Sequence, residues 1–308
     1  MKISVISPVY GAETIVQELV SRISNVMDSL EFDYEIILVE DGSPDKSWNE
    51  IEQVCSMNKF VKGVKLSRNF GQHCAITAGL QESTGDAVIV MDCDLQDNPK
   101  YIPILIDNWQ NGSDIVYTKK KKRKHSWFKN LSARLFNWVF NYLVDNKSWE
   151  NSGSIGSYSL LSRKVVDSFQ LINDYRRHYL MVLRWLGYTY VIVEIEHEKR
   201  YSGKSSYNLS KLIIHAIDGI TSQSDKLLRL TMVLGFIISA VSFIAASAVV
   251  YLAIYTSFSP GWPSLFVLIL FIGGLIISSI GISGIYIGKI FEQTKGRPLF
   301  VVDKRLNE

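Results

Sequence analysis

Two aspartates spaced two residues apart, Asp92 and Asp94, are the residues best suited to chemistry in this chain. They end an apolar run, residues 87–91, whose length and composition predict a fully buried strand. On an extended backbone such residues point to the same side, so the two carboxylates are expected to converge. Together with the amide oxygen of Gln96 they suit Mg²⁺ or Mn²⁺, and Mg²⁺ shares its coordination shell with substrate phosphates. A solvated acidic turn is the alternative for an isolated Asp-x-Asp.

Strand and helix patterns alternate through the first half of the chain, which is typical of an α/β fold with a parallel sheet. Polar motifs follow three of the expected strands, and these ends should meet at the carboxyl edge of the sheet, where open α/β sheets bind ligands. There Asp41 could accept hydrogen bonds from a base or ribose, or it could be a plain turn residue. Strands are expected at residues 3–8, 35–39, 63–66, 87–91, 114–118, 158–161 and 191–195, and helices near residues 13–30, 45–57, 73–82 and 99–109.

A long uncharged stretch, residues 230–288, contrasts with the ordinary soluble composition of residues 1–229. Residues 230–254 and 264–288 are each long enough to cross a hydrocarbon core about 30 Å thick. A buried helical hairpin is the alternative, but two such stretches make it the weaker interpretation. Lysine and arginine flank both stretches and are absent between them, which predicts cytoplasmic termini. The expected domains are a cytoplasmic catalytic domain at 1–225, two transmembrane helices within 226–291, and a cytoplasmic tail at 292–308.

A run of six basic residues, 119–124, accounts for the net charge of +3, since without it the chain would be net negative. No nucleic-acid motif accompanies the run, so we expect no nucleic-acid partner. A basic cluster facing anionic lipid or a phosphorylated ligand is favoured over a solvated loop. Residues 126–144 and 207–220 have the pattern of amphipathic helices at a membrane interface. For residues 126–144, a helix covering the sheet fits equally well.

Five motifs carry a resemblance to a known family. They are Pro8-Val9-Tyr10, Glu40-Asp41-Gly42-Ser43, Ser67-Arg68-Asn69-Phe70-Gly71, Asp92-Cys93-Asp94-Leu95-Gln96-Asp97 and Arg200-Tyr201-Ser202-Gly203-Lys204-Ser205-Ser206-Tyr207. In their order and spacing the chain resembles the membrane-anchored polyprenyl-phosphate glycosyltransferases of glycosyltransferase family 2, such as bactoprenol glucosyltransferases and dolichol-phosphate mannose synthases. The resemblance covers essentially the whole chain.

The resemblance implies a GT-A (Rossmann-like) nucleotide-sugar-binding domain, followed by the interface helices and a two-helix transmembrane hairpin. It further implies a nucleotide-sugar donor, with UDP-glucose as the default, a Mg²⁺ or Mn²⁺ ion and a polyprenyl phosphate acceptor. It also implies a homo-oligomer, with a tetramer as one option, in the cytoplasmic membrane. Carried over by position, Asp92, Asp94 and Gln96 would hold the metal. Nucleotide-sugar contacts would come from Pro8, Tyr10, Glu13, Asp41 and Asp92, catalytic contacts from Asp92, Asp94, Arg200 and Lys204, and acceptor contacts from Arg200, Lys204, Ser205 and Arg123.

The chain departs from the family pattern where other members commonly have Asp-Phe-Arg, because Ser157-Tyr158-Ser159 stands there. No catalytic carboxylate can be transferred to that position. A phosphate acceptor with a second pKa of about 6 is largely ionised at neutral pH, so it needs positioning more than deprotonation. We therefore expect inverting transfer of a sugar, glucose by default, for modification of cell-surface polysaccharide. One alternative is a processive polysaccharide synthase, which would carry the motif Gln-x-x-Arg-Trp. Here Arg184-Trp185 is present, but Met181 stands at the position of the glutamine. The other alternative is a non-catalytic membrane scaffold or flippase subunit.

Overall fold

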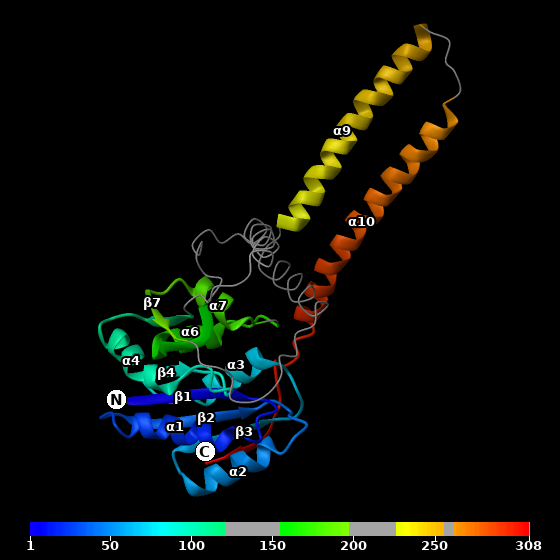
Figure 1. Cartoon of the computed structure of the whole chain (residues 1–308). Coiled ribbons are helices and arrows are strands. Elements are labelled where there is room, and N and C mark those ends of the chain that lie inside the picture. Colours follow the sequence, from blue (N-terminus) through cyan, green and yellow to red (C-terminus); the bar gives the residue numbers. More distant parts are fainter. Residues whose placement is uncertain (121–154, 176, 197–225, 256–260, 308) are drawn as a thin grey trace. The chain divides into compact units, whose positions relative to one another are not determined.

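The computed structural model describes residues 1–120, 155–175, 177–196, 226–255 and 261–307 (Figure 1). Their strands form one sheet in the order β7-β5-β6-β4-β1-β2-β3-β8. The central strands are buried along nearly their whole length, which explains their continuous apolar sequences. The strands are β1 (Lys2–Val9), β2 (Asp33–Glu40), β3 (Val61–Leu66), β4 (Ala87–Val90), β5 (Ile115–Lys120), β6 (Ile155–Ser162), β7 (Tyr190–Ile195) and β8 (Val302–Leu306).

The sheet is mixed, so the expectation of a parallel sheet is correct for the block β4-β1-β2-β3 and for the edge pair β5-β7, but not for the sheet as a whole. β1 pairs in parallel with β2 and β4, and β2 pairs in parallel with β3. β6, however, lies antiparallel between β4 and β5, and β8 lies antiparallel to β3. An apolar run records that a strand is buried but not the direction in which the chain enters it, so the pattern of the sequence could not reveal this.

Helices cover both faces of the sheet (Figure 1). The face under α1 carries the larger core, and α1 buries one side through residues at helical spacing: Val16, Leu19, Val20, Ile23 and Met27. On the opposite face α3 packs directly on β1 and β2, and α6 and α7 pack against α3. The helices are α1 (Val16–Met27), α2 (Ser47–Met57), α3 (Gln72–Glu82), the 3-10 turn η1 (Pro99–Tyr101), α4 (Ile102–Gln110), α6 (Arg163–Leu171) and α7 (Tyr179–Leu186).

A second compact unit contains two long helices, α9 (Lys226–Tyr255) and α10 (Trp262–Thr294), which contact one another. Within the part of the chain that the structure describes, one helical stretch, Phe271–Thr294, has the length and composition needed to cross a membrane. Leu228–Ile238 in α9 forms a shorter apolar stretch. The two expected helices are therefore present. The expectation that each of them spans a membrane is supported for α10.

The C-terminal residues return to the sheet, where the sequence pattern had indicated only a tail. β8 pairs with β3, and Asn307 then anchors the end of the chain. Its side-chain amide donates to the carbonyl oxygens of Cys55 and Val61, both at 2.8 Å. Arg305 also forms an ion pair of 3.0 Å with Glu82 of α3. Residues before and after the second unit thus belong to one folded unit.

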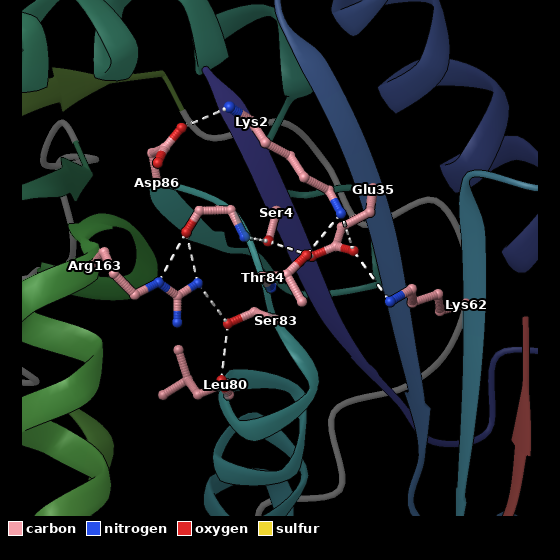
Figure 2. Close-up of polar contacts among 10 residues, drawn as sticks. Lys2, Ser4, Glu35, Lys62, Leu80, Ser83, Thr84, Asp86 and Arg163 are labelled. Carbon is pink, nitrogen blue, oxygen red and sulfur yellow. Dashed lines mark hydrogen bonds and ion pairs between the residues drawn. The ribbon is translucent and has the colours of Figure 1, made fainter. Parts of the chain in front are cut away.

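A buried carboxylate, Glu35, joins the strands at the amino edge of the sheet (Figure 2). It is only 2% exposed. One oxygen accepts hydrogen bonds from Ser4 Oγ at 2.6 Å and the Thr84 amide at 2.8 Å, and the other lies 2.8 Å from Lys2 Nζ and 3.3 Å from Lys62 Nζ. Burial alone would raise the pKa of Glu35, but the hydrogen bonds from Lys2, Ser4 and Thr84 outweigh it and lower the pKa to about 2.

Glu35→Gln is expected to destabilise the protein in a pH-dependent way. The pKa of Glu35 falls from 4.5 to about 2 on folding, so its stabilisation is complete above pH 4.5 and is lost as the pH falls toward 2. A shift of this size corresponds to about 3 kcal/mol at neutral pH. Thermal unfolding of the full chain in detergent, measured from pH 7 down to pH 2, should show the difference from wild type shrinking over that range. The exposed Glu31→Gln is the control, and a difference that stays constant with pH would contradict the assignment.

Candidate active site

The strand order reverses beside β1, and the ends of three strands meet there at the carboxyl edge of the sheet. β1 pairs with β2 on one side and with β4 on the other. The amide of Asp41 donates to the carbonyl of Val9, and the amide of Met91 donates to the carbonyl of Ile6, both at 3.0 Å. The three strand ends expected to converge are therefore held side by side. Ligands of open α/β sheets bind at such a reversal point.

Asp92 and Asp94 are half-buried at this edge. Asp92 Oδ1 accepts hydrogen bonds from Gln72 Nε2 at 2.7 Å and from Ser157 Oγ at 2.9 Å. Asp94 Oδ1 accepts from the backbone amide of Gln96 at 3.1 Å. β4 ends at Val90, so the aspartates are not on an extended strand as the sequence argument assumed. They are presented instead by a turn that includes Cys93 and Asp94 and is followed by Leu95 at φ 57°.

Asp41 connects two of the sequence motifs. Its side chain is 3% exposed, and its two oxygens accept hydrogen bonds from the backbone amides of Phe70 at 2.7 Å and Gly71 at 2.9 Å. Burial raises the pKa of Asp41 above its ordinary value, although both amides favour the ionised form. Asp41 therefore fixes the loop that leads into α3, and through it the position of Gln72 next to Asp92. Its expected contact with a nucleotide stays a prediction.

The remaining nucleotide candidates lie at the end of β1. Pro8 is buried within the strand, whereas Tyr10 is 53% exposed at its end. The Tyr10 backbone donates a hydrogen bond to the thiol sulfur of Cys93, whose pKa is raised to about 12, mainly by burial. Glu13 Oε2 accepts a hydrogen bond of 3.3 Å from the amide of Lys46. An exposed aromatic ring beside the carboxylate turn is a suitable surface for a planar base.

The sequence profile described as "Glycosyl transferase family 2" matches residues 4–169. The chain belongs to glycosyl transferase family 2. It is 34% identical over 307 residues to a protein named bactoprenol glucosyl transferase from Shigella phage SfX, covering 99% of this chain and 100% of that protein. It is 30% identical over 310 residues to the undecaprenyl-phosphate 4-deoxy-4-formamido-L-arabinose transferase of Proteus mirabilis, covering 98% and 93%.

Among solved structures, the fold is similar to glucosyl-3-phosphoglycerate synthase from Mycobacterium tuberculosis, crystallised with Mn²⁺, UDP and phosphoglyceric acid. The TM-score is 0.50 at 18% identity, and the likeness covers 71% of this chain and 76% of the other. This similarity concerns the fold alone. Family membership and full-length relatives together identify this family 2 protein as a glycosyltransferase, as the sequence predicted, rather than a non-catalytic scaffold.

The oxygen ligands at this site fit a cation that is also coordinated by the substrate, rather than a cation coordinated by protein side chains alone. Within the described part of the chain, no three His, Cys, Asp or Glu side chains are grouped to hold a metal ion. Asp92 and Asp94 supply two carboxylates. Mg²⁺ is commonly held by one or two carboxylates and completed by substrate phosphates and water. For Gln96 the structure shows a backbone contact with Asp94, so a role for its side-chain amide stays a prediction.

Two residues that contact Asp92 were not among the expected site residues. Gln72 directly follows the Ser67–Gly71 motif, so its position beside the motif was a usable signal. Ser157 stands where family members commonly have an aspartate, and its hydroxyl donates a hydrogen bond to Asp92. A hydroxyl can orient this carboxylate, but it adds no charge there.

Four of the expected site residues lie outside the described part of the chain: Arg123, Arg200, Lys204 and Ser205. The same holds for the expected interface helices at 126–144 and 207–220. Of the basic run, Lys119 and Lys120 are placed, at the end of β5. The roles of these segments in acceptor and membrane binding therefore stay predictions.

Proposed function

We propose that this glycosyltransferase moves glucose from UDP-glucose to undecaprenyl phosphate or a similar polyprenyl phosphate at the cytoplasmic face of the membrane. The observation that carries the proposal is the pair Asp92 and Asp94 beside the end of β1, at the reversal point of the sheet. Relatives named as bactoprenol and undecaprenyl-phosphate transferases, aligned over nearly the whole chain, support the acceptor. The names of these two relatives give different sugars, so the donor is tested separately from the acceptor.

In the proposed reaction a phosphate oxygen of the lipid attacks the anomeric carbon of the sugar, and the bond from that carbon to the nucleoside diphosphate breaks. The attacking oxygen is already ionised near neutral pH, so no protein base has to accept a proton. Asp92, held in place by Gln72 and Ser157, and Asp94 would hold Mg²⁺ or Mn²⁺. A bound cation would supply Lewis-acid stabilisation of the leaving diphosphate. Direct displacement inverts the anomeric centre and gives a β-linked product from an α-linked donor.

The function is tested with purified full-length protein in detergent, undecaprenyl phosphate, and UDP-glucose or other nucleotide sugars in parallel. Mass spectrometry of the lipid fraction should detect a hexosyl phospholipid with UDP-glucose as donor. A product with another donor only would replace glucose and keep the acceptor. Absence of any glycolipid, with hydrolysis of the donor still present, would reject the lipid acceptor.

The return of the C-terminus to the sheet supports the proposal that this chain crosses the membrane twice. β8 pairs with β3, so the chain must end on the same side of the membrane as the catalytic sheet. If the apolar stretch Phe271–Thr294 of α10 crosses the bilayer, a single crossing would separate β8 from β3. A second crossing is then required, and α9, a helix of 30 residues, is long enough to provide it.

A cysteine introduced as Ser259→Cys is expected to react with a membrane-impermeant maleimide on intact cells. The connection between α9 and α10 contains no lysine or arginine, which favours the outer side. A cysteine added after Glu308 should be labelled only after the cells are opened. Wild type, which contains Cys55, Cys74 and Cys93, gives the background signal. Labelling of the C-terminal cysteine on intact cells would reverse the topology.

A further inference from the structure

Arg177 is a buried arginine whose charge the described protein groups do not fully satisfy. It precedes α7 and is 8% exposed. Its Nη2 donates a hydrogen bond of 3.3 Å to Asn173 Oδ1. Its Nε and Nη1 are buried and have no hydrogen-bond partner among the residues that the structure describes. Burying charged donors without partners costs free energy, so these two groups call for an explanation.

The segment that carries Arg177 is joined to Asp92 through β6. The hydroxyls of Tyr179 and Ser159 lie 2.7 Å apart in the core, and Ser159 Oγ also donates to the carbonyl of Ser157 at 2.8 Å. Ser157 in turn donates to Asp92. Two residues after Arg177, the chain is therefore fixed to the strand that orients the candidate catalytic carboxylate.

A second set of contacts joins the same segment to the first turn of α3. The rings of His73 and His178 lie 4.1 Å apart between centroids, and the amide of Tyr179 donates to His73 Nδ1 at 3.5 Å. His73 directly follows Gln72, which donates to Asp92. The two residues that follow Arg177 are thus connected to both groups that donate to Asp92, Ser157 and Gln72.

The charges around Arg177 are consistent with an anion site. Burial and the negative charge of Asp41 raise the pKa of Cys74, in the first turn of α3, and the positive charges of Arg177 and Arg68 partly oppose this shift. The His73–His178 contact likewise places the segment that carries Arg177 at the amino end of α3, where the helix dipole favours an anion. The pKa of Arg177 is lowered by burial and raised in part by Asp174, an exposed residue. At position 159, where other family members commonly have an arginine, this chain has the neutral Ser159. That position therefore provides no positive charge for a phosphate.

We propose that Arg177 binds a phosphate oxygen of a substrate through Nε and Nη1. The inference rests on the proposed function, since both substrates of that reaction carry phosphate: the diphosphate of the donor and the terminal phosphate of the lipid. A charge-assisted hydrogen bond from a desolvated guanidinium is strong and would position the phosphate beside Asp92.

The test compares Arg177→Met, Arg177→Lys and the surface variant Arg22→Met in the full-length protein. Arg22 forms an ion pair with Glu18 on α1 and serves as the matched loss of one positive charge. KM is measured separately for UDP-glucose and for undecaprenyl phosphate, because KM, unlike kcat, does not change when part of a preparation is misfolded. Arg177→Met is expected to raise one KM about tenfold or more, and Arg177→Lys to raise it less. Arg22→Met should leave both KM values unchanged.

The two substrates distinguish the two sources of phosphate. A rise in KM for UDP-glucose, with weaker binding of UDP, assigns Arg177 to the donor. A rise in KM for undecaprenyl phosphate assigns it to the lipid. If wild type transfers sugar and Arg177→Met keeps both KM values, Arg177 does not bind phosphate and the inference is wrong. If wild type transfers no sugar to lipid, the proposed function itself fails.

Discussion

Asp92→Asn is expected to abolish sugar transfer while leaving the fold intact. The oxygen of an asparagine at this position can still accept the hydrogen bonds that Gln72 and Ser157 donate to Asp92 Oδ1, so the substitution removes little except the charge. Loss of a carboxylate that holds the cation on the leaving diphosphate should remove several kcal/mol of transition-state stabilisation, or a factor of about 1,000 in kcat/KM. Asp94→Ala should have a similar effect, measured as glycolipid formation by mass spectrometry.

The control is Asp86→Asn at the opposite edge of the sheet. Asp86 also accepts a backbone hydrogen bond, from the Lys2 amide at 2.8 Å, but it lies at the amino ends of the strands (Figure 2). It should retain transfer. Activity of wild type should also vanish in excess EDTA and return with Mg²⁺ or Mn²⁺. Full activity of Asp92→Asn would show that Asp92 holds no required cation, and full activity of wild type in EDTA would show that neither carboxylate does.

Gly42→Ala is expected to destabilise the catalytic unit by about 3 kcal/mol or more and to remove activity. Gly42 has φ 63°, and a Cβ there would lie 2.3 Å from the amide nitrogen of Asn69 and 2.5 Å from the carbonyl carbon of Arg68. These are backbone atoms of the loop that Asp41 holds through Phe70 and Gly71, so they cannot move aside without breaking those bonds. Displacing the loop would also displace Gln72 from Asp92.

Gly11→Ala separates the two causes of this destabilisation. Gly11 has the same φ of 63°, but a Cβ at this position would meet nothing within 4 Å. It therefore reports the cost of the left-handed backbone alone, about 1–2 kcal/mol. Thermal and urea unfolding of both variants should show a clearly larger loss for Gly42→Ala. Equal losses would mean that the close approach of the two loops contributes nothing.

The place where the candidate site residues meet could be predicted from the sequence, because these residues follow directly on strands. Tyr10, Asp41 and Asp92 each come just after a buried apolar run, and the carboxyl ends of neighbouring parallel strands meet at one edge whatever the details of packing. The amphipathic pattern of α1 and the apolar lengths of α9 and α10 were equally local signals. Family membership was predictable for the same reason, since the motifs are short and their order is read along the chain.

Only the tertiary structure decided which of these residues touch one another. Asp41 bonds to an amide 30 residues away, Ser157 to a carboxylate 65 residues away, and Asn307 to a carbonyl 246 residues away. The antiparallel insertion of β6 and the return of β8 depend on the path of the chain between strands, and burial of Arg177 depends on how the segment before α7 meets α3. Hydrophobic periodicity records that a residue is buried and on which face. It does not record the partner or the direction of approach, because those are set by the packing of elements distant in the sequence.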